Sequence, residues 1–252
     1  MTMKLIIPAA VCLTAMCCAP LIRAQNPPEP SVKIRTLATG RIIDGLKYGG
    51  YADGKLVKGG DLPQINIRFR SEPISYSGPQ ELLFFNQDPP ASIIPEPDKP
   101  LPPEPVAKVV LPAGSKNVLL LFVPRPAKEG GVLYDVLSKD DSTDNLPYGK
   151  YLILNFTKRE IGAIAESAKV MIPSSSNVAV SPGLTGEGSF YISFYDSKNL
   201  SQPVAKQLWY HYPLARCLII LQDVPGNETD IAISSISEFS PDYVPPKTEG
   251  AQ

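Results

Sequence analysis

The chain has 252 residues, with 24 Lys and Arg against 25 Asp and Glu, and only one His. A hydrophobic share of 43% supplies enough apolar material for a sizeable core and excludes wholesale disorder. The near-neutral charge argues against a nucleic-acid binder, which needs a clustered cationic surface. A single imidazole excludes catalytic and metal sites built on several histidines.

Residues 1–24 have the layout of a secretory signal peptide. Lys4 supplies a positive first region, residues 5–22 contain no charge, and Ala24 is a small residue suited to the position before cleavage. An uncleaved membrane anchor is the alternative, but two prolines within the apolar run make a poor spanning helix. We therefore expect an exported protein, located in the periplasm, in the outer envelope or outside the cell.

Removal of residues 1–24 leaves Cys217 as the only cysteine, so no intrachain disulfide can form. Cys217 lies in the continuous apolar run of residues 216–221. We expect a buried, inert thiol, because a reactive thiol needs a cationic and accessible setting.

The first half of the mature chain has the patterns of β-strands separated by turns. Val32–Leu37 alternates apolar and polar residues, and Asp53-Gly54 marks a tight hairpin turn. Expected strands cover residues 32–37, the two arms of 45–60, 65–69, 81–86, 106–111 and 118–123. The last two strands flank a Pro- and Gly-containing turn, so we predict that they form a hairpin. Residues 88–105 hold eight prolines and predict an extended loop without strand pairing.

The second half repeats this style at higher hydrophobicity. Expected strands cover residues 133–137, 150–156, 169–172, 189–195, 206–212, 216–223 and 231–236. Residues 161–169 contain helix-forming Ala and Glu, but we favour a strand there because Gly162 and the flanking strands oppose a helix.

These patterns predict an all-β protein of one or two immunoglobulin-like, antiparallel β-sandwich units joined in tandem. The first unit is expected at residues 30–125, including the Pro-rich loop, and the second at residues 130–240. Residues 241–252 are expected to form a disordered tail. No convincing internal sequence repeat relates the two halves.

No catalytic constellation is recognisable. His211, the single imidazole, has no nucleophile elbow to serve and is expected to be structural. Asp140, Asp141 and Asp144 form the densest acidic segment, but their spacing does not match a calcium loop. We therefore expect a solvated acidic turn, with no metal site and no cofactor.

Aromatic residues form the candidate binding site. Strand alternation places Tyr191 and Tyr195 on one face, and it places Tyr210 and Tyr212 on the face opposite Trp209. If the two strands pair, these tyrosines form an exposed patch of the kind that stacks on sugar rings or docks proteins. The alternative is that the rings are cross-strand pairs that line a core.

Three segments carry a resemblance to a known group. They are Leu111–Ser115 before an apolar strand, Tyr151–Phe156, and Trp209–Asp223. Together with the signal peptide, residues 106–239 resemble uncharacterised exported β-sandwich proteins of environmental Gram-negative bacteria. That group has no assigned activity, so the resemblance implies fold and compartment only.

The sequence thus predicts an exported, non-catalytic binding or structural module of the periplasm or cell envelope, with an envelope protein or a glycan as partner. One alternative is a carbohydrate-binding module that uses the tyrosine patch. A second is a glycosidase-like hydrolase that uses an Asp/Glu pair facing a pocket. No nucleic-acid partner is expected, and membrane contact is expected only through an uncleaved signal segment.

Overall fold

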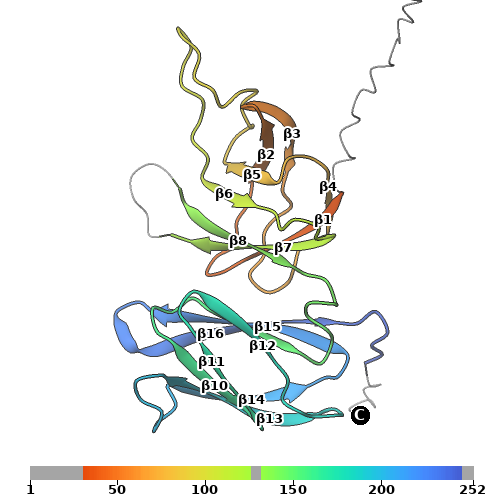
Figure 1. Cartoon of the computed structure of the whole chain (residues 1–252), viewed down its shortest axis with the longest axis vertical. Helices are drawn as coiled ribbons and strands as arrows, with labels where there is room; N and C mark the ends of the chain where they lie inside the picture. The colour runs from red at the N-terminus through yellow and green to blue at the C-terminus, as the bar shows by residue number, and fades with distance from the viewer. Residues whose placement is uncertain (1–30, 126–131, 246–252) are drawn as a thin grey trace, which may run out of the picture.

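The computed structural model describes residues 31–125 and 132–245. The described residues contain sixteen β-strands and no helix, which confirms the all-β fold and its sandwich units (Figure 1). No helix capable of crossing a membrane occurs in this part of the chain. The predicted signal peptide and the end of the predicted tail, residues 246–252, lie outside the described residues.

The first sandwich comprises two four-stranded sheets. Its inner sheet has the order β4-β1-β7-β8, with bounds β1 Val32–Ala38, β4 Ile74–Tyr76, β7 Asn117–Pro124 and β8 Tyr134–Asp140. Its outer sheet has the order β3-β2-β5-β6, with bounds β2 Lys47–Ala52, β3 Lys55–Asp61, β5 Glu81–Phe85 and β6 Ala107–Val110. The predicted turn between β2 and β3 is present, because Asp53 and Gly54 both have positive φ.

The second sandwich also comprises two four-stranded sheets. Its inner sheet has the order β12-β9-β15-β16, with bounds β9 Tyr151–Asn155, β12 Ser176–Val180, β15 Ala215–Val224 and β16 Asn227–Phe239. Its outer sheet has the order β11-β10-β13-β14, with bounds β10 Ile161–Ala165, β11 Ala168–Ile172, β13 Gly188–Asp196 and β14 Ala205–His211. Residues 161–169 are therefore β-structure and not a helix.

The two sandwiches share one topology. Counted from the start of each sandwich, the inner sheet has the order 4-1-7-8 and the outer sheet has the order 3-2-5-6 in both. In both sandwiches the first and seventh strands are parallel, and the remaining pairs are antiparallel. The molecule is thus a structural repeat, although the sequence shows none, because a sandwich constrains the alternation of its strands far more than their residue identities.

Two strand predictions in the first half are wrong. The expected hairpin over residues 106–123 does not form, because Leu111 to Lys116 lead the chain from β6 in the outer sheet to β7 in the inner sheet. Residues 65–69 form only an isolated bridge, from Ile65 to Ile43. The side chain of Asn66 accepts a hydrogen bond from the amide of Arg68 at 2.9 Å, and this local bond competes with strand pairing.

The four sheets are stacked, with the two inner sheets in contact (Figure 1). A third apolar core lies between them, in addition to the core inside each sandwich. Its buried members are Leu37, Leu119, Leu121, Leu146, Leu154, Leu218, Ile220 and Ile236. The strands β7 and β15 are consequently buried on both faces, which explains their unbroken apolar sequences.

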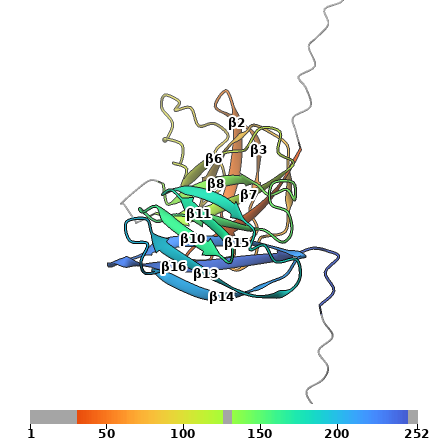
Figure 2. The ribbon, with the colours of Figure 1, turned by 60° about the horizontal axis from the view of Figure 1, so that its bottom comes forward.

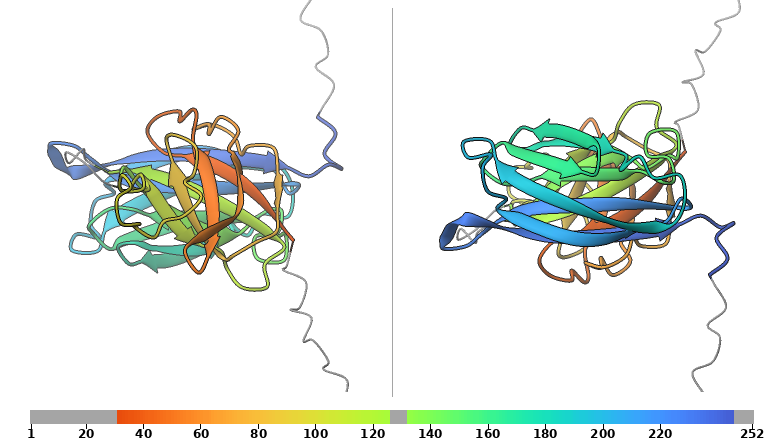
Figure 3. Two further views of the ribbon diagram at one scale, coloured as in Figure 1. Left: turned by 90° about the horizontal axis from the view of Figure 1, so that it is seen from above. Right: turned by 90° about the horizontal axis from the view of Figure 1, so that it is seen from below.

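The long strand β16 runs along the edge of the second sandwich (Figure 2). Seen along the stack, the orange strands of the first sandwich cross the blue β16 at a steep angle (Figure 3). In the stack of four sheets, the outer sheet of the second sandwich lies farthest from the first sandwich (Figure 1).

Candidate functional site

The outer surface of the sheet β11-β10-β13-β14, here called the outer tyrosine face, is the candidate site. The strands β13 and β14 pair antiparallel, with Tyr191 opposite Leu208 and Ser189 opposite Tyr210. Tyr191 is 51% exposed, Leu208 is 60% exposed and Tyr210 is 49% exposed. Strand pairing and alternation thus bring two of the predicted tyrosines to one solvent-facing surface.

The other predicted aromatic residues differ in their positions. Tyr195 is half-buried on the same face as Tyr191, and Tyr212 follows β14 with its ring centroid 4.7 Å from that of Tyr210. Trp209 does not belong to this face, because it packs against the core inside the second sandwich, with its ring centroid 6.1 Å from that of Tyr151. The alternation predicted this separation of Trp209 from Tyr210.

A shallow apolar groove of about 360 Å³ opens beside Tyr195. Its walls include Met171 of β11 and Leu200 of the β13–β14 connection, which are both exposed. Gly162 leaves room here, since a Cβ atom at this position would lie 3.2 Å from the sulfur of Met171. Sequence reasoning missed this groove because Met171, Gly162 and Leu200 come from three separate segments.

The exposed rings do not form one flat platform. The planes of Tyr210 and Tyr212 are tilted by 50°, and those of Tyr212 and Phe239 by 70°. Tyr243 stacks on Phe239 at 4.4 Å, so this residue of the expected tail is packed against β16. The face of the Tyr191 ring is already occupied by the ammonium group of Lys206, which lies 4.4 Å from the ring centroid.

The first sandwich covers part of the corresponding sheet with its own chain, while Val57 of β3 and Val110 of β6 stay exposed. Phe85 of β5 lies outside the inter-sheet core and is nevertheless 1% exposed. The ring of Tyr51 packs against it, and the Tyr51 hydroxyl donates a hydrogen bond to the carbonyl of Pro90 at 2.9 Å. Burial raises the pKa of Tyr51 to about 12. Part of the Pro-rich segment therefore packs on this sheet.

Residues 90–94, here called the covering segment, bend and are bound to β3 and its turn through the backbone. Ser92 forms an isolated bridge with Lys55, so the prediction of an extended loop without strand pairing is wrong here. The amide of Leu56 donates to the carbonyl of Ala91, and the amide of Ile93 donates to the carbonyl of Gly54, both at 2.9 Å. In the first sandwich the β5–β6 connection covers residues 86–106, whereas in the second the equivalent β13–β14 connection covers only residues 197–204. The second connection is too short to cover its sheet in the same way.

His211 and Cys217 lie inside the second sandwich. The Nδ1 atom of His211 is 3.1 Å from the Tyr151 hydroxyl, and burial lowers the pKa of His211 so that the ring is neutral. Burial raises the pKa of Cys217 to about 11. The prediction of a buried cysteine is confirmed, and the thiol is held in its unreactive form.

A buried ionic cluster joins the two sandwiches at one end of their interface. Glu238 of β16 pairs with Arg35 of β1 at 2.5 Å, with Arg216 of β15 at 2.7 Å and with Arg70 at 3.5 Å. Asp141 pairs with Arg70 at 3.4 Å and with Arg216 at 3.5 Å. The prediction of a solvated acidic turn is wrong for Asp141, whose side chain is only 6% exposed.

The two carboxylates of this cluster have opposite pKa shifts. Burial raises the pKa of Asp141 despite the opposing charges of Arg70 and Arg216. For Glu238 burial also acts to raise the pKa, but the charge of Arg70 and the hydrogen bonds from Arg35 and Arg216 outweigh it, so the pKa is lowered. Glu238 is therefore the more firmly ionised of the two.

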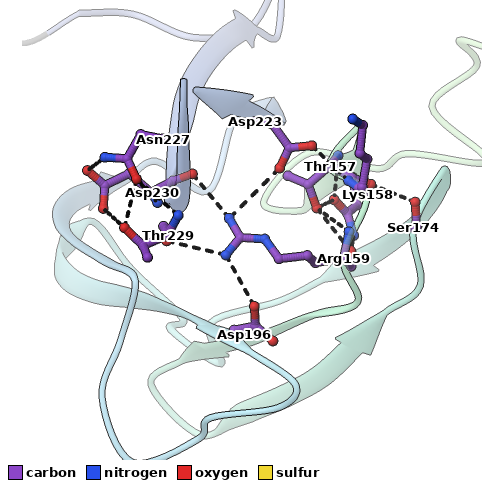
Figure 4. A network of polar contacts seen from close by, with 10 residues as sticks. Thr157, Lys158, Arg159, Ser174, Asp196, Asp223, Asn227, Thr229 and Asp230 are labelled. Carbon is purple, nitrogen blue, oxygen red and sulfur yellow. Dashed lines mark hydrogen bonds and ion pairs between the residues drawn. The ribbon is translucent and has the colours of Figure 1, made fainter. Parts of the chain in front are cut away.

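A second polar network lies at the end of the β15–β16 pair opposite to Arg216 and Glu238 (Figure 4). The Arg159 guanidinium contacts Asp196 at 3.1 Å and Asp223 at 3.8 Å, and it donates to the carbonyls of Thr229 and Asp230 at 3.3 and 3.1 Å. It thereby ties the β9–β10 turn to β13 and to the β15–β16 hairpin. The partners of Arg159 are protein groups on separate segments of the chain, so this network holds these segments together.

Across residues 31–125 and 132–245, no group of three His, Cys, Asp or Glu side chains is placed to hold a metal ion. Comparison with protein-family models finds no match, and neither does comparison with curated proteins. The resemblance based on residues 106–239 therefore stays a prediction.

Proposed function

We propose that this chain is an exported, non-catalytic docking module that binds an extended polypeptide segment of an envelope protein on its outer tyrosine face. The observation that carries the proposal is the difference between the two outer sheets. In the first sandwich residues 90–94 bind the β2–β3 end of the sheet and Tyr51 packs on Phe85, whereas in the second sandwich Tyr191, Leu208 and Tyr210 are left exposed. Exposed apolar surface of this kind is typical of interaction sites.

The first sandwich also indicates the kind of occupant. Its covering segment contains proline, and combines backbone hydrogen bonds at the β2–β3 end with a hydrogen bond from Tyr51, whose ring packs on Phe85. A partner segment of the same type fits the second sheet, since strands and grooves of such sheets recognise extended peptides through alternate side chains. The groove beside Tyr195 would accept one apolar side chain of that segment.

A protein partner is favoured over a glycan by the ring geometry. Sugar rings stack on flat aromatic faces, but the planes of Tyr210 and Tyr212 are tilted by 50° and one face of the Tyr191 ring is covered by Lys206. Tilted rings with an adjacent apolar groove are suited to irregular side chains. The carbohydrate-binding module is therefore the weaker proposal.

The hydrolase alternative also finds less support. Asp141 and Glu238 both line one cavity, as such an enzyme requires. Both carboxylates are bound in ion pairs with arginines, and Arg216 contacts both of them. A carboxylate held in this way is a poor proton donor or nucleophile, so we propose no catalytic role for this pair.

The docking proposal is tested by photo-crosslinking in the native cell. Benzoylphenylalanine replaces Leu208 in the full chain, and a matched probe replaces Val110, which is 59% exposed on the outer sheet of the first sandwich. We expect a discrete protein adduct from the Leu208 probe alone. A synthetic peptide of the crosslinked segment should then bind the purified chain, with affinity reduced roughly tenfold or more by Y191S combined with Y210S.

The opposite results are equally clear. Adducts that form equally from both probes, or peptide binding that is unchanged by Y191S and Y210S, would show that the outer tyrosine face is not the docking surface. Binding to a glycan array that depends on the same two tyrosines would replace the proposal by the carbohydrate-binding alternative. Export is checked separately, by cell fractionation and by sequencing the N-terminus of the mature protein, where we expect cleavage after Ala24.

A further inference from the structure

A polar cavity of about 440 Å³ lies between the two sandwiches, at the end of the interface opposite the third core. The first sandwich contributes Lys33 and Arg35, and the second contributes Arg216 and Glu238. Asp141, Asn117 and the hydroxyl-bearing residues Ser142, Thr143 and Tyr148 complete the polar part of its lining. Its size falls within the range of about 300–1,000 Å³ typical of small-molecule sites.

The cavity has more positive than negative charge around it. Three arginines and two carboxylates form the contiguous ion-pair cluster, namely Arg35, Arg70, Arg216, Asp141 and Glu238. Lys33 adds a further positive charge to the lining, and no ion pair of Lys33 occurs among the described residues. Lys33 is exposed, so the buried excess is that of the ion-pair cluster, where three arginines face two carboxylates. Such an excess is unfavourable unless a counter-charge is present.

Two further acids near the cluster do not line the cavity. Glu72 acts on Arg35 but is exposed, so solvent screens its charge. Asp140 accepts hydrogen bonds from the Ser115 hydroxyl at 3.2 Å and from the Ser142 amide at 2.9 Å and lies outside the lining. The lining itself holds Lys33, Arg35 and Arg216 against Asp141 and Glu238, an excess of one positive charge.

Arg70 pairs with Asp141 and Glu238 of the lining without lining the cavity itself, and it is the strongest sign of unsatisfied positive charge in the cluster. Its side chain is only 4% exposed, yet none of its three guanidinium nitrogens forms a hydrogen bond with a described residue. Asp141 Oδ2 and Glu238 Oε2 lie at 3.4 and 3.5 Å, and both carboxylates also pair with Arg216. Buried guanidinium groups are ordinarily hydrogen-bonded, so two carboxylates are too few for three arginines.

We propose that the cavity between the sandwiches binds a small molecule through an oxyanion, either a carboxylate or a phosphate group. Arg35 and Lys33 bind the anion, and the hydroxyls of Ser142, Thr143 and Tyr148 donate hydrogen bonds to it. Arg35 uses only Nη1 for Glu238, which leaves Nε and Nη2 for a second acceptor. Because the ligand contacts both sandwiches, its binding stabilises their association.

The test is calorimetric titration of the purified full-length chain with inorganic phosphate and with malonate, at constant ionic strength set by sodium chloride. We expect saturable binding of at least one of the two anions, accompanied by a concentration-dependent rise in Tm. Preference for phosphate or for malonate identifies the oxyanion. Failure of both anions to bind above the chloride background would overturn the proposal.

Variants locate the site. K33Q and R35Q should each weaken anion binding roughly tenfold or more, because each removes a cation from the wall. K33Q keeps the proposal testable if R35Q impairs folding, since Lys33 has no ion-pair partner among the described residues. R125Q is the matched control, because Arg125 is an exposed arginine that pairs with Asp135 outside this cavity.

E238Q tests the sign of the effect. Removal of one carboxylate increases the positive charge at the wall, so phosphate or malonate should bind several-fold more tightly. Equal affinity of K33Q, R35Q and the unaltered chain would show that the anion binds elsewhere. Y191S and Y210S should leave anion binding unchanged, so the outcome is independent of the docking proposal.

Discussion

The two sandwiches have the same strand order but differ in what lies on their outer sheets. In the first, the long β5–β6 connection lays residues 90–94 against β3 and helps to bury Phe85. In the second, the short β13–β14 connection leaves Tyr191, Leu208 and Tyr210 in solvent. Topology therefore does not decide which parts of an outer sheet stay exposed; the length of one connection contributes to that difference.

The two inner sheets resemble each other more closely than the two outer sheets do in the way they are covered. Both contribute their first and seventh strands to the interface between the sandwiches, with apolar side chains such as Leu121 and Ile220 at one end and charged side chains such as Arg35 and Glu238 at the other. The apolar end fixes the two sandwiches together, and the charged end leaves the polar cavity. The following changes test this comparison, from the largest expected effect to the smallest.

F85A should be the most destabilising change to an outer sheet. Deletion of a buried phenyl ring costs about 3–5 kcal/mol of unfolding free energy, and here it also removes the contact with Tyr51. Urea unfolding measures the loss, and hydrogen exchange at the amides of Leu56 and Ile93 should accelerate as the covering segment detaches. Unchanged exchange at these amides would show that Phe85 does not hold the segment.

I220A tests whether the third core couples the two sandwiches. Ile220 is buried between the inner sheets, so truncation should cost about 2–5 kcal/mol. We expect the sandwiches to lose cooperativity, visible in calorimetry as a broadened or split transition. L208A, on the exposed outer face, is the control and should shift stability by about 0.5 kcal/mol or less. A single sharp transition in I220A would argue against coupling through this core.

R159A tests the Arg159 network, which ties the β9–β10 turn to β13 and to the β15–β16 hairpin of the second sandwich. It removes charge-assisted hydrogen bonds to Asp196 and to the carbonyls of Thr229 and Asp230, at an expected cost of about 2 kcal/mol. Hydrogen exchange should rise selectively in the β15–β16 hairpin. If R159K retains full protection, a positive charge alone is sufficient and the planar fork of the guanidinium is not required.

Y191S should have the smallest effect on stability. The ring of Tyr191 is half in solvent, so we expect a change within about 0.5 kcal/mol in urea unfolding. The contrast with F85A is the sharpest form of the comparison, because both residues lie on the outer surface of an outer sheet. A loss as large as that of F85A would mean that the outer tyrosine face serves folding and not docking.

Much of the fold could be predicted because alternation and turn chemistry are local. Val32–Leu37 alternates in the manner of a half-buried strand, and Asp53-Gly54 adopts the positive φ values of a hairpin turn. The separation of Tyr210 from Trp209 follows from the same period of two. The strands β4 and β12 were missed, because β4 has only three residues and β12 begins in the Pro- and Ser-containing residues 173–176, which favour a turn.

The sequence by itself determined the all-β class, the inward and outward faces of most strands, and the burial of Cys217, since each depends on neighbouring residues. Only the tertiary structure decided that β6 and β7 belong to different sheets and that the halves repeat one topology. It also decided that Asp141 meets Arg70 and Arg216 in a buried cluster. These features depend on contacts between residues far apart in the chain, and local patterns do not record which distant segments will meet.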